Sequence, residues 1–587
     1  MLGFGALVDL SLAPLAPDAA DRLARPLAGI AGAVITRHAG DMCVAQAADA
    51  RPQPYDDDLP YRDADLVVAG VLRLDAQARL RDALAPGAPD ALAGASDARL
   101  VALAFRRWHD RLAEHLLGDY AFVVWHRASG QLVAARDPLG NRQLFWARSG
   151  SLVAFGSSVE LVRALPGVAG ALDEVSIASI LREGWIERAE GTALRDVHRV
   201  PAAHTLCLAR DAAPVLRRHW EFPDPPPLRF AREDDYALRF NEVLDEVVAD
   251  RLRGGGATVL LSGGMDSSSL AVAARRAAPE SPLCALTMVN PTLAPSDDDH
   301  LSHEIARRLG IERETCDLEH VIPLSYLQDL PSLPAQPLDE PDLAALRLQT
   351  AAAARQAPLA FFGEDGDMLL HAPTLLGQLR TQSPVEVARA WLAYRRRAGH
   401  WPWIGLDWRR RLRRRSGDAP VRAWWVSSPA DERRPRGAHR VRPQAVRALT
   451  SPQWDALFET LEPATTRSAV LYTFPFTDPR LLEVAFAIPP VPWCQEKTLL
   501  RRAMRDALPP AVLARPKTPQ AGFLEARVAQ WRAAGLADTP ISPRVAPWVD
   551  VDAVRRVLRE GAPYDVLDAW RVLQVDAWLA REETPRA

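Results

Sequence analysis

Cysteine, long apolar runs and an excess of either charge are all scarce in this chain of 587 residues. Its five cysteines, at positions 43, 207, 284, 316 and 494, have neither C-x-x-C nor zinc-finger spacing, which argues against a disulfide framework or a zinc site. There is no apolar run of about 18 residues and no signal-like start, so a membrane span is not expected. The net charge of −3 indicates no general attraction to nucleic acid or to a membrane surface. We therefore expect a soluble, cytoplasmic protein that binds neither nucleic acid nor membrane.

Proline marks the main boundary along the chain. The segment 223–227, Pro-Asp-Pro-Pro-Pro, can continue neither a helix nor a central strand. A chain of this length, with 48% hydrophobic side chains, is long enough for about two to four domains with buried cores. We place a first domain at 1–222, a linker at 223–233 and a second domain at 234–587, with an insert at about 391–440.

Short apolar runs of strand type alternate with polar turns in the first domain. One helix-like stretch, at 98–117, interrupts them, and this mixture predicts an α+β sandwich. The strand-like runs lie at 4–10, 66–74, 120–125, 132–135 and 152–155.

The second domain differs, because helical and strand-like segments alternate along it. In order they are a helix at 234–253, a strand at 259–261, a helix at 270–278, a strand at 283–289, a helix at 300–309 and a strand at 359–362. This alternation predicts a parallel sheet with helices on both faces. Ligands of such sheets bind at the carboxyl ends of the strands, where both Ser262 and Gly363 fall.

A loop rich in serine and glycine, 261–269, joins the first of these strands to a helix. Its sequence is Leu-Ser-Gly-Gly-Met-Asp-Ser-Ser-Ser. The glycines let the backbone approach a ligand, and the serines open a helix whose free N–H groups attract phosphate oxygens. A carboxylate beside phosphates is unfavourable unless a cation lies between them, so the loop predicts a nucleotide with Mg²⁺. It is not a Walker A loop, because no lysine follows the glycines.

Two further motifs supply charged groups. An apolar strand runs into Gly363-Glu364-Asp365-Gly366-Asp367, which brings carboxylates to a second strand end. We expect Asp266 and Asp367 to hold Mg²⁺ together. Lys517 stands between two prolines, and a cation on so rigid a segment suits the charge that develops on phosphate and acyl oxygens. The residues expected to bind the nucleotide are Leu260, Ser262, Gly263, Gly264, Asp266, Ser267, Ser268 and Gly363.

These motifs resemble those of the asparagine synthetase superfamily over nearly the whole chain. The loop resembles its Ser-Gly-Gly-x-Asp-Ser pyrophosphate loop, 363–368 is similar to its Gly-Glu-Gly-x-Asp-Glu motif with two departures, and Lys517 falls on its catalytic lysine. The first domain resembles the superfamily's glutaminase domain at 66–74, 118–122 and 136–140. The resemblance implies a glutaminase-like sandwich of the N-terminal-nucleophile type, followed by an ATP-pyrophosphatase domain. It also suggests Glu364 as the residue that takes or orients the proton of an attacking amine.

The most informative feature is a departure from the family. Leu2 stands where the family has its nucleophilic cysteine, and Ala69 where it has an asparagine that stabilises the oxyanion. Leucine can neither be deprotonated nor attack a carbonyl. We therefore expect that glutamine is not the nitrogen donor and that the attacking amine arrives on a substrate.

Two groups in the superfamily resemble this arrangement, the β-lactam synthetases and the lasso peptide cyclases. The β-lactam synthetases carry a tyrosine at the place of Glu364, which favours the cyclase. The tryptophans and arginine clusters of the insert suit a peptide or partner protein, although an amphipathic helical insert fits them equally well. The favoured prediction is adenylation of an Asp or Glu side chain in a precursor peptide, followed by ring closure by its N-terminal amine, with a leader-binding or leader-cleaving partner. An asparagine synthetase that uses free ammonia and a non-catalytic nucleotide-binding scaffold are the alternatives.

Overall fold

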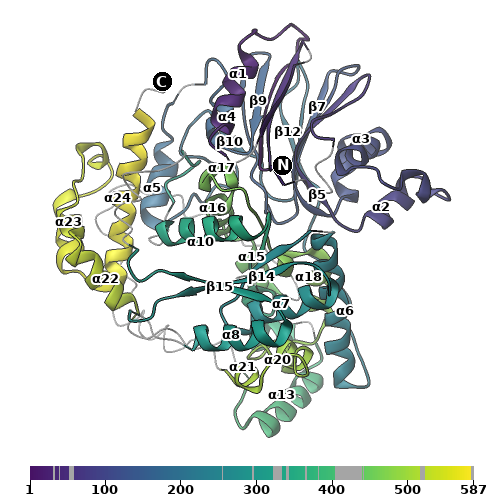
Figure 1. Ribbon diagram of the computed structural model, residues 1–587, viewed down its shortest axis with the longest axis vertical. Coiled ribbons are helices and arrows are strands. Elements are labelled where there is room, and N and C mark those ends of the chain that lie inside the picture. Colours follow the sequence, from purple (N-terminus) through teal and green to yellow (C-terminus); the bar gives the residue numbers. More distant parts are fainter. Residues whose placement is uncertain are drawn as a thin grey trace.

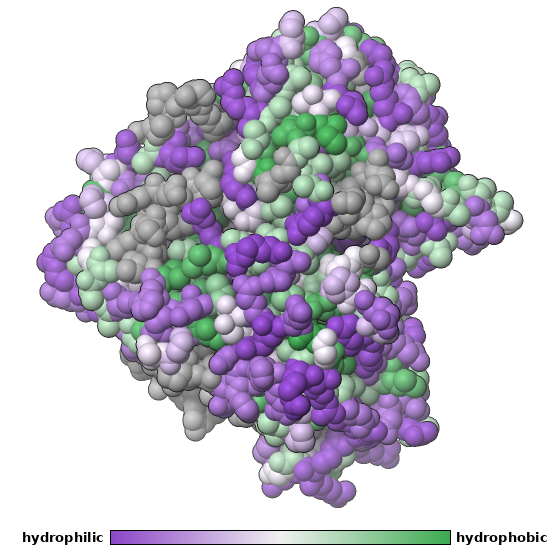
Figure 2. Space-filling view, viewed as in Figure 1, coloured by the Kyte–Doolittle hydropathy of each residue, from purple (hydrophilic) through white to green (hydrophobic). Residues whose placement is uncertain are grey.

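Two domains are stacked along the longest axis of the molecule (Figure 1). The computed structural model describes the chain except for residues 31–32, 39, 52–57, 169, 254, 294–296, 322–332, 339–342, 364–365, 381, 403–438, 440–441, 516–522 and 584–587. Within the described part, no helix is both long and apolar enough to span a bilayer. The face seen in Figure 1 is mostly hydrophilic, with smaller hydrophobic patches between the charged side chains (Figure 2).

The N-terminal domain is built on two antiparallel sheets of six strands, in the orders β10-β8-β9-β1-β3-β2 and β12-β11-β7-β6-β5-β4. Alternate residues of β5 enter different cores: Ala69 and Val71 pack towards β1, and Val68 and Leu72 pack with helix α3 (Asp97–Trp108). This alternation buries both faces of the second sheet. The strands are β1 (Gly3–Asp9), β2 (Ala33–His38), β3 (Met42–Ala48), β4 (Tyr61–Arg62), β5 (Leu66–Leu74), β6 (Gly118–His126), β7 (Gln131–Arg136), β8 (Phe145–Ser149), β9 (Leu152–Gly156), β10 (His198–Arg199), β11 (His204–Leu208) and β12 (Val215–Arg218).

Helices cover the outer sides of this pair of sheets, which agrees with the expected α+β sandwich. The helices α1 (Ala19–Ala24) and α4 (Val159–Val162) contact the first sheet, and α3 (Asp97–Trp108) contacts the second. The remaining helices of this domain are α2 (Gln77–Leu84) and α5 (Glu174–Glu183).

The predicted helix at 98–117 is wrong in its second half. The α-helix ends at Trp108, because His109 has a φ of +53°, which a right-handed helix does not allow. A 3₁₀ segment, His109–His115, follows and still buries Leu112. Apolar spacing therefore continued past the end of the helix and concealed the break.

The C-terminal domain contains a five-stranded sheet in the order β15-β14-β13-β16-β17, and every pair of neighbours is parallel, which confirms the predicted parallel sheet. Val259 of β13 packs in the same cluster as α7 (Met265–Ala277), whereas Leu260 packs with α10 (Leu343–Gln356), so helices cover both faces. The strands are β13 (Ala257–Leu260), β14 (Leu283–Val289), β15 (Glu312–Asp317), β16 (Leu359–Phe361) and β17 (Leu471–Thr473).

The helices of this domain surround the sheet and then return to the N-terminal domain. Residues 223–232 contain neither helix nor strand, and α6 begins at Glu233. At the other end of the chain, α24 lies beside α5 (Figure 1), and Glu582 forms an ion pair with Arg163. The helices are α6 (Glu233–Leu252), α7 (Met265–Ala277), α8 (Asp298–Leu309), α10 (Leu343–Gln356), α11 (Gly366–Leu369), α12 (Leu375–Leu379), α13 (Pro384–Ala398), α15 (Pro443–Leu449), α16 (Gln453–Leu461), α17 (Pro463–Thr466), α18 (Pro479–Ala487), α19 (Pro490–Trp493), α20 (Thr498–Ala503), α21 (Pro510–Ala514), α22 (Phe523–Ala533), α23 (Val551–Glu560) and α24 (Pro563–Glu583).

Candidate nucleotide and metal site

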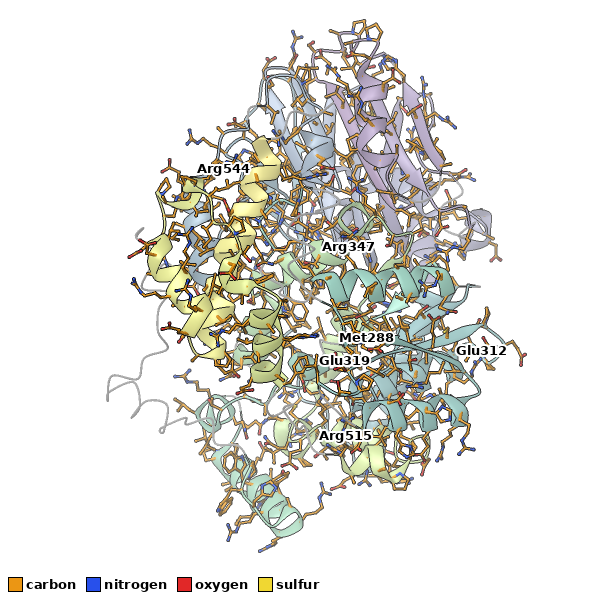
Figure 3. The ribbon with its side chains drawn as sticks, turned by 60° about the vertical axis from the view of Figure 1, so that its left-hand side comes forward. Met288, Glu312, Glu319, Arg347, Arg515 and Arg544 are labelled. Carbon is orange, nitrogen blue, oxygen red and sulfur yellow. The ribbon has the colours of Figure 1, made fainter. Side chains whose placement is uncertain are left out.

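The serine- and glycine-rich loop follows β13 at the carboxyl edge of the parallel sheet. Figure 3 labels residues at both ends of the strands. Glu312 lies where β15 begins, and Met288 and Glu319 lie near the opposite, carboxyl ends of β14 and β15. Gly263 has a φ of +69°, and a Cβ there would lie 2.8 Å from Cβ of Leu301. Both facts require glycine at this position. The turn thus leaves β13 and enters α7 within four residues, 261–264.

Helix α7 begins at Met265, two residues earlier than the serines that were expected to open it. Asp266 is therefore in the first turn of the helix, where the helix dipole favours a negative charge. The loop is held by its own hydroxyl groups: the side-chain oxygens of Ser262 and Ser267 are 3.1 Å apart, and the Ser262 N–H donates to Ser267 Oγ at 3.2 Å. Ser262 is exposed, so its hydroxyl faces solvent at the strand end.

Ser268 does not fit its predicted role. Its side chain is fully buried inside α7, and its N–H donates to the carbonyl oxygen of Gly264 at 3.1 Å. A nucleotide would have to displace both the core packing and this helical hydrogen bond to contact it. Ser267 is 8% exposed, and its hydroxyl accepts a hydrogen bond from the Ser262 N–H of the loop.

The second carboxylate motif lies directly against the first loop. A Cβ on Gly363 would be 3.3 Å from the backbone nitrogen of Ser267, and a Cβ on Gly366 would be 2.6 Å from Cγ of Asp266. The second distance is too short for any side chain, so glycine at 366 permits the approach of α11 to Asp266. Asp367, the next residue, is in the first turn of α11. The two predicted metal ligands are consequently neighbours.

Lys497 is not among the predicted residues, yet its ammonium group joins both carboxylates. It forms an ion pair with Asp266 and lies 2.8 Å from Oδ1 of Asp367. Burial lowers the pKa of Lys497, but the charges and hydrogen bonds of the two carboxylates outweigh it and raise the pKa above its ordinary value. Lys497 precedes α20 with a φ of +57°, and Glu496 has a φ of +47°. Two consecutive residues in this strained region are typical of functional sites.

Amino-acid usage contains the signal that would have identified Lys497. The chain has 71 basic residues of the Lys and Arg types, and only Lys497 and Lys517 are lysines. The other 69 basic residues are arginines, so arginine supplies the general surface charge of this chain. The two lysines therefore indicate positions at which an ammonium group is needed. Lys517 itself lies outside the described residues, as does Glu364.

The residues brought together suit a magnesium ion. The ion prefers oxygen ligands, commonly takes one or two carboxylates from the protein, and completes its shell with phosphates and water. Asp266 and Asp367 already share one cation, the ammonium of Lys497. Among the described residues, no group of three or more His, Cys, Asp or Glu side chains is placed to hold a metal, so a zinc-type site is not found there.

The insert expected at about 391–440 falls largely outside the described residues, including Trp403, Trp408, Trp424 and Trp425. Of its described tryptophans, Trp391 is buried in α13 and donates its indole N–H to Gln378 at 2.9 Å, so it is a core residue. Trp401 is 45% exposed, and the guanidinium of Arg395 lies 4.7 Å from its ring centroid. This cation–π pair is the described part of the arginine and tryptophan surface.

Leu2, which the family resemblance aligns with the nucleophilic cysteine, is packed rather than open. Leu2 is 2% exposed within the main hydrophobic cluster, and its N–H donates to the carbonyl oxygen of Ala47 at 2.7 Å. Ala69 is fully buried, and the carbonyl oxygen of the next residue, Gly70, accepts a hydrogen bond from the Gln46 amide at 3.0 Å. Core side chains therefore surround the two positions that the resemblance aligns with the thiol and the oxyanion donor of a glutaminase.

A buried network of charges fills the boundary between the domains. Arg73 of β5 lies 2.5 Å from Asp119 of β6, and Arg251 of α6 lies 3.2 Å from Asp75 and 2.9 Å from Asp478. Burial raises the pKa of Asp75 to about 6, while neighbouring arginines hold the pKa of Asp119 well below its usual range despite its burial. Further pairs cross this boundary: Arg136 with Asp455, Arg142 with Glu462, Arg199 with Glu459, Arg253 with Asp97 and Arg467 with Glu160. The two domains are thus joined by paired charges as well as by a common core.

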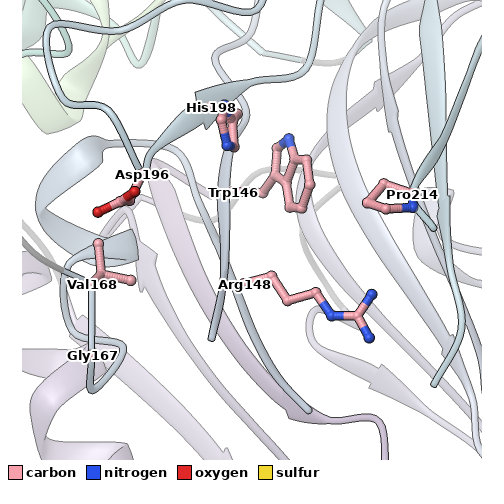
Figure 4. Close-up of a pocket in the computed structure, with 7 residues that line it drawn as sticks. All are labelled: Trp146, Arg148, Gly167, Val168, Asp196, His198 and Pro214. Carbon is pink, nitrogen blue, oxygen red and sulfur yellow. The ribbon is translucent and has the colours of Figure 1, made fainter. Parts of the chain in front are cut away.

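A hollow of about 300 Å³ lies on the N-terminal domain (Figure 4). It is lined by Trp146, Arg148, Gly167, Val168, Asp196, His198 and Pro214. None of these is a predicted site residue, and the hollow belongs to the region around β8 and β10 rather than to the parallel sheet.

Comparison with known proteins agrees with this geometry. The sequence model of asparagine synthase matches residues 239–580, and that of a glutamine amidotransferase domain matches 52–220, which leaves out β1 and Leu2. The chain is 27% identical over 177 residues to asparagine synthetase [glutamine-hydrolyzing] 3 of Bacillus subtilis, covering 30% of this chain and 28% of that protein. It is 29% identical over 182 residues to amidase chry2 of Gibberella zeae, covering 30% of this chain and 26% of that protein. It is 28% identical over 211 residues to a putative asparagine synthetase [glutamine-hydrolyzing] of Mycobacterium tuberculosis, covering 34% of this chain and 31% of that protein.

The chain therefore spans only about a quarter to a third of the length of these curated relatives. The asparagine synthase match, by contrast, covers more than half of the chain and includes the whole of the described site. Members of this family are ATP-dependent amide-forming ligases that release AMP and pyrophosphate. The chain belongs to the asparagine synthase family.

Proposed function

We propose that this protein joins a carboxylate and an amine of the same peptide, as lasso peptide cyclases do, and consumes ATP in the process. The observation that carries the proposal is a contrast between the two domains. Asp266, Asp367 and Lys497 gather at the end of the parallel sheet, whereas Leu2 is buried where glutamine hydrolysis would need a thiol. A ligase that keeps these charged residues of its activating half but lacks the cysteine for glutamine hydrolysis requires an amine from elsewhere.

The proposed reaction has two steps. In the first, an oxygen of an Asp or Glu side chain of the precursor peptide attacks the α-phosphorus of ATP, and the bond to the β-phosphate oxygen breaks to release pyrophosphate. In the second, the N-terminal amine of the peptide attacks the acyl carbon, loses a proton and displaces AMP, which leaves an amide bond. Because both reacting groups are on one chain, holding the peptide in a folded shape makes the second step effectively unimolecular.

The residues of the site have separate tasks in this reaction. Backbone N–H groups at the start of α7 would bind phosphate oxygens. Asp266 and Asp367 would hold Mg²⁺, which neutralises phosphate charge when it is bound. Lys497 supplies a fixed positive charge beside them. Lys517 and Glu364 are proposed, from the family resemblance, as the residues that stabilise the transition state and handle the amine proton.

The exposed pair of Trp401 and Arg395 supports a peptide substrate. Tryptophan and arginine are enriched among the residues that dominate binding in protein contacts, and here one of each lies exposed side by side. A leader-binding or leader-cleaving partner is part of the proposal, because ring closure on a precursor requires removal of the leader to free the amine.

The second candidate is an asparagine synthetase that uses free ammonia. Two of the three relatives above carry the name asparagine synthetase, and the same carboxylates and lysine would activate aspartate. A β-lactam synthetase is a further alternative with the same first step. An assay with ATP, Mg²⁺, aspartate and ammonium distinguishes the ammonia-dependent enzyme, because asparagine would then form without any peptide.

The test of the favoured function uses intact mass. The protein is incubated with ATP, Mg²⁺ and a candidate precursor peptide whose leader has been removed, so that the attacking amine is free. The expected product has lost one water while AMP and pyrophosphate accumulate in equal amounts. The Asp266→Ala variant should form neither. ADP and free phosphate as products, or asparagine formation from ammonium at a faster rate, would rule out the cyclase.

A further inference from the structure

We propose that the ammonium group of Lys497 occupies the place of the metal in the nucleotide-free protein, and that a divalent cation displaces it from Asp266 and Asp367. The inference rests on the proposed function, since it takes these two carboxylates as the metal ligands. It gives a role to Lys497, a residue to which neither the sequence motifs nor the similar proteins assign one.

Geometry requires competition between the two cations. The Lys497 nitrogen forms an ion pair with Asp266 and lies 2.8 Å from Asp367 Oδ1, so it sits between the oxygens that would bind Mg²⁺. A magnesium ion that used these oxygens as ligands would lie about 2.1 Å from them. An ammonium nitrogen and a metal ion cannot both occupy that space, and their charges repel at such a separation.

Charge explains why the lysine is there. The side chains of Asp266 and Asp367 are 14% and 30% exposed, and the Lys497 side chain is 18% exposed. Two carboxylates that are brought together out of bulk water repel unless a cation lies between them. The ammonium supplies that cation before nucleotide arrives, and it keeps the two carboxylates in the positions that a metal needs.

The backbone of Lys497 stays in place when the ammonium moves. Its carbonyl oxygen accepts a hydrogen bond from the Arg501 N–H at 2.9 Å, and Arg501 Nε donates to the carbonyl oxygen of Glu496 at 2.8 Å. The four-carbon side chain, by contrast, turns about several single bonds. A displaced ammonium therefore remains within reach of the same site.

Metal binding by the nucleotide-free protein measures this competition. We expect Mn²⁺ alone to bind the Lys497→Met variant at least about tenfold more tightly than the wild type in a calorimetric titration, since removal of the competing cation frees both carboxylates. The Lys497→Gln variant should show the same gain in Mn²⁺ affinity. It provides a second, polar substitution in case Lys497→Met does not fold. Arg502→Met is the matched control, because Arg502 of α20 pairs with Glu233 and Asp234 at 3.0 and 2.9 Å instead. It should change the affinity less than twofold.

A second measurement follows the lysine itself. The chain has only two lysines, so protein made with ¹³C-labelled lysine gives two sets of Cε signals, and a Lys517→Arg variant assigns them. Addition of Mg²⁺ without nucleotide should shift the Lys497 signal in a saturable manner, and Asp367→Asn should abolish the shift.

Equal or weaker Mn²⁺ binding by both Lys497 variants, or a Lys497 signal that does not respond to Mg²⁺, overturns the proposal. Neither measurement involves a peptide or ATP. Failure of the exchange therefore differs from failure of the proposed function, which the mass of the product reports.

Discussion

Thr473, at the end of β17, donates its hydroxyl hydrogen to Asp119 of β6, 3.1 Å away in the other domain. The same hydroxyl oxygen accepts a hydrogen bond from Arg251 Nε at 2.9 Å. The carbonyl oxygen of Thr473 in turn accepts from the N–H of Phe362 at 3.0 Å, one residue before Gly363. The N-terminal domain thus supports the strand next to the carboxylate loop, which gives it a structural task independent of glutamine.

Asp119→Asn is expected to lower the stability of the whole protein. Asp119 is buried and keeps its negative charge because Arg73, Arg251 and Arg142 outweigh the cost of burial. Its loss leaves buried guanidinium groups without a full counter-charge, which typically costs about 3–5 kcal/mol. Thermal unfolding measures the effect. Glu242→Gln, which breaks an exposed ion pair with Arg239, is the control and should change the midpoint little. If both variants unfold at the wild-type temperature, the network does not hold the domains together.

Stability is also expected to depend on pH through Glu462. Burial raises the pKa of this carboxyl to about 7 although Arg142 lowers it. The folded protein therefore binds the proton more tightly than the unfolded chain, where the pKa is 4.5. The stabilisation from this group is complete below about pH 4.5 and is lost as the pH rises through 7. The total change is of the order of 3 kcal/mol.

The Glu462→Gln variant isolates this contribution, because its amide is neutral at every pH. Between pH 5 and pH 8, the midpoint temperature of thermal unfolding should fall further for the wild type than for the variant. Equal decreases would mean that Glu462 ionises normally in the folded state. Asp75 and Asp137, whose pKa values burial raises to about 6, act in the same direction and are present in both proteins. The difference between the two curves therefore belongs to Glu462.

The parallel sheet was predictable where its strands are apolar, as at 259–261, 283–289 and 359–362. The ends of the first and last of these runs, before Ser262 and Gly363, correctly located the site. The edge strand β15, Glu312–Asp317, has the sequence Glu-Arg-Glu-Thr-Cys-Asp, and its charges conceal it. An edge strand is half solvated, so no apolar pattern is required of it. The strand β17 has three residues, too few for a period of two to show.

The site was predictable only in part, for a related reason. Asp266 and Asp367 follow strands, and parallel strands bring their carboxyl ends together. Lys497 instead precedes a short helix, more than a hundred residues further along, and tertiary packing alone brings it to the carboxylates. The spacing of apolar residues along the sequence contains no information on this contact between distant segments. The rarity of lysine in an arginine-rich chain does, and it indicates Lys497 and Lys517 together.

Gly366→Ala is expected to impair adenylation without unfolding the protein. The added Cβ would lie 2.6 Å from Cγ and 2.7 Å from Oδ1 of Asp266, so one of the two loops must shift. A displacement of about 1 Å at a reacting centre commonly costs about a hundredfold in rate, and we expect a loss of that size in AMP formation. Gly377→Ala is the matched control, since its Cβ would meet no atom closer than 3.4 Å. Activity of Gly366→Ala within a few fold of the wild type would show that the contact does not position Asp266.

Restoring the missing thiol should not restore glutamine hydrolysis. Leu2 is 2% exposed in a hydrophobic cluster, and a thiol there would be held neutral by its surroundings. Cys43, on the neighbouring strand β3, illustrates the effect: burial raises its pKa to about 11. We expect Leu2→Cys, alone or with Ala69→Asn, to release no more glutamate from glutamine than the wild type, as measured by mass spectrometry. Glutamate release by the wild type itself would contradict the proposed source of the amine, and release that depends on the introduced thiol would show that a glutamine pocket persists in this core.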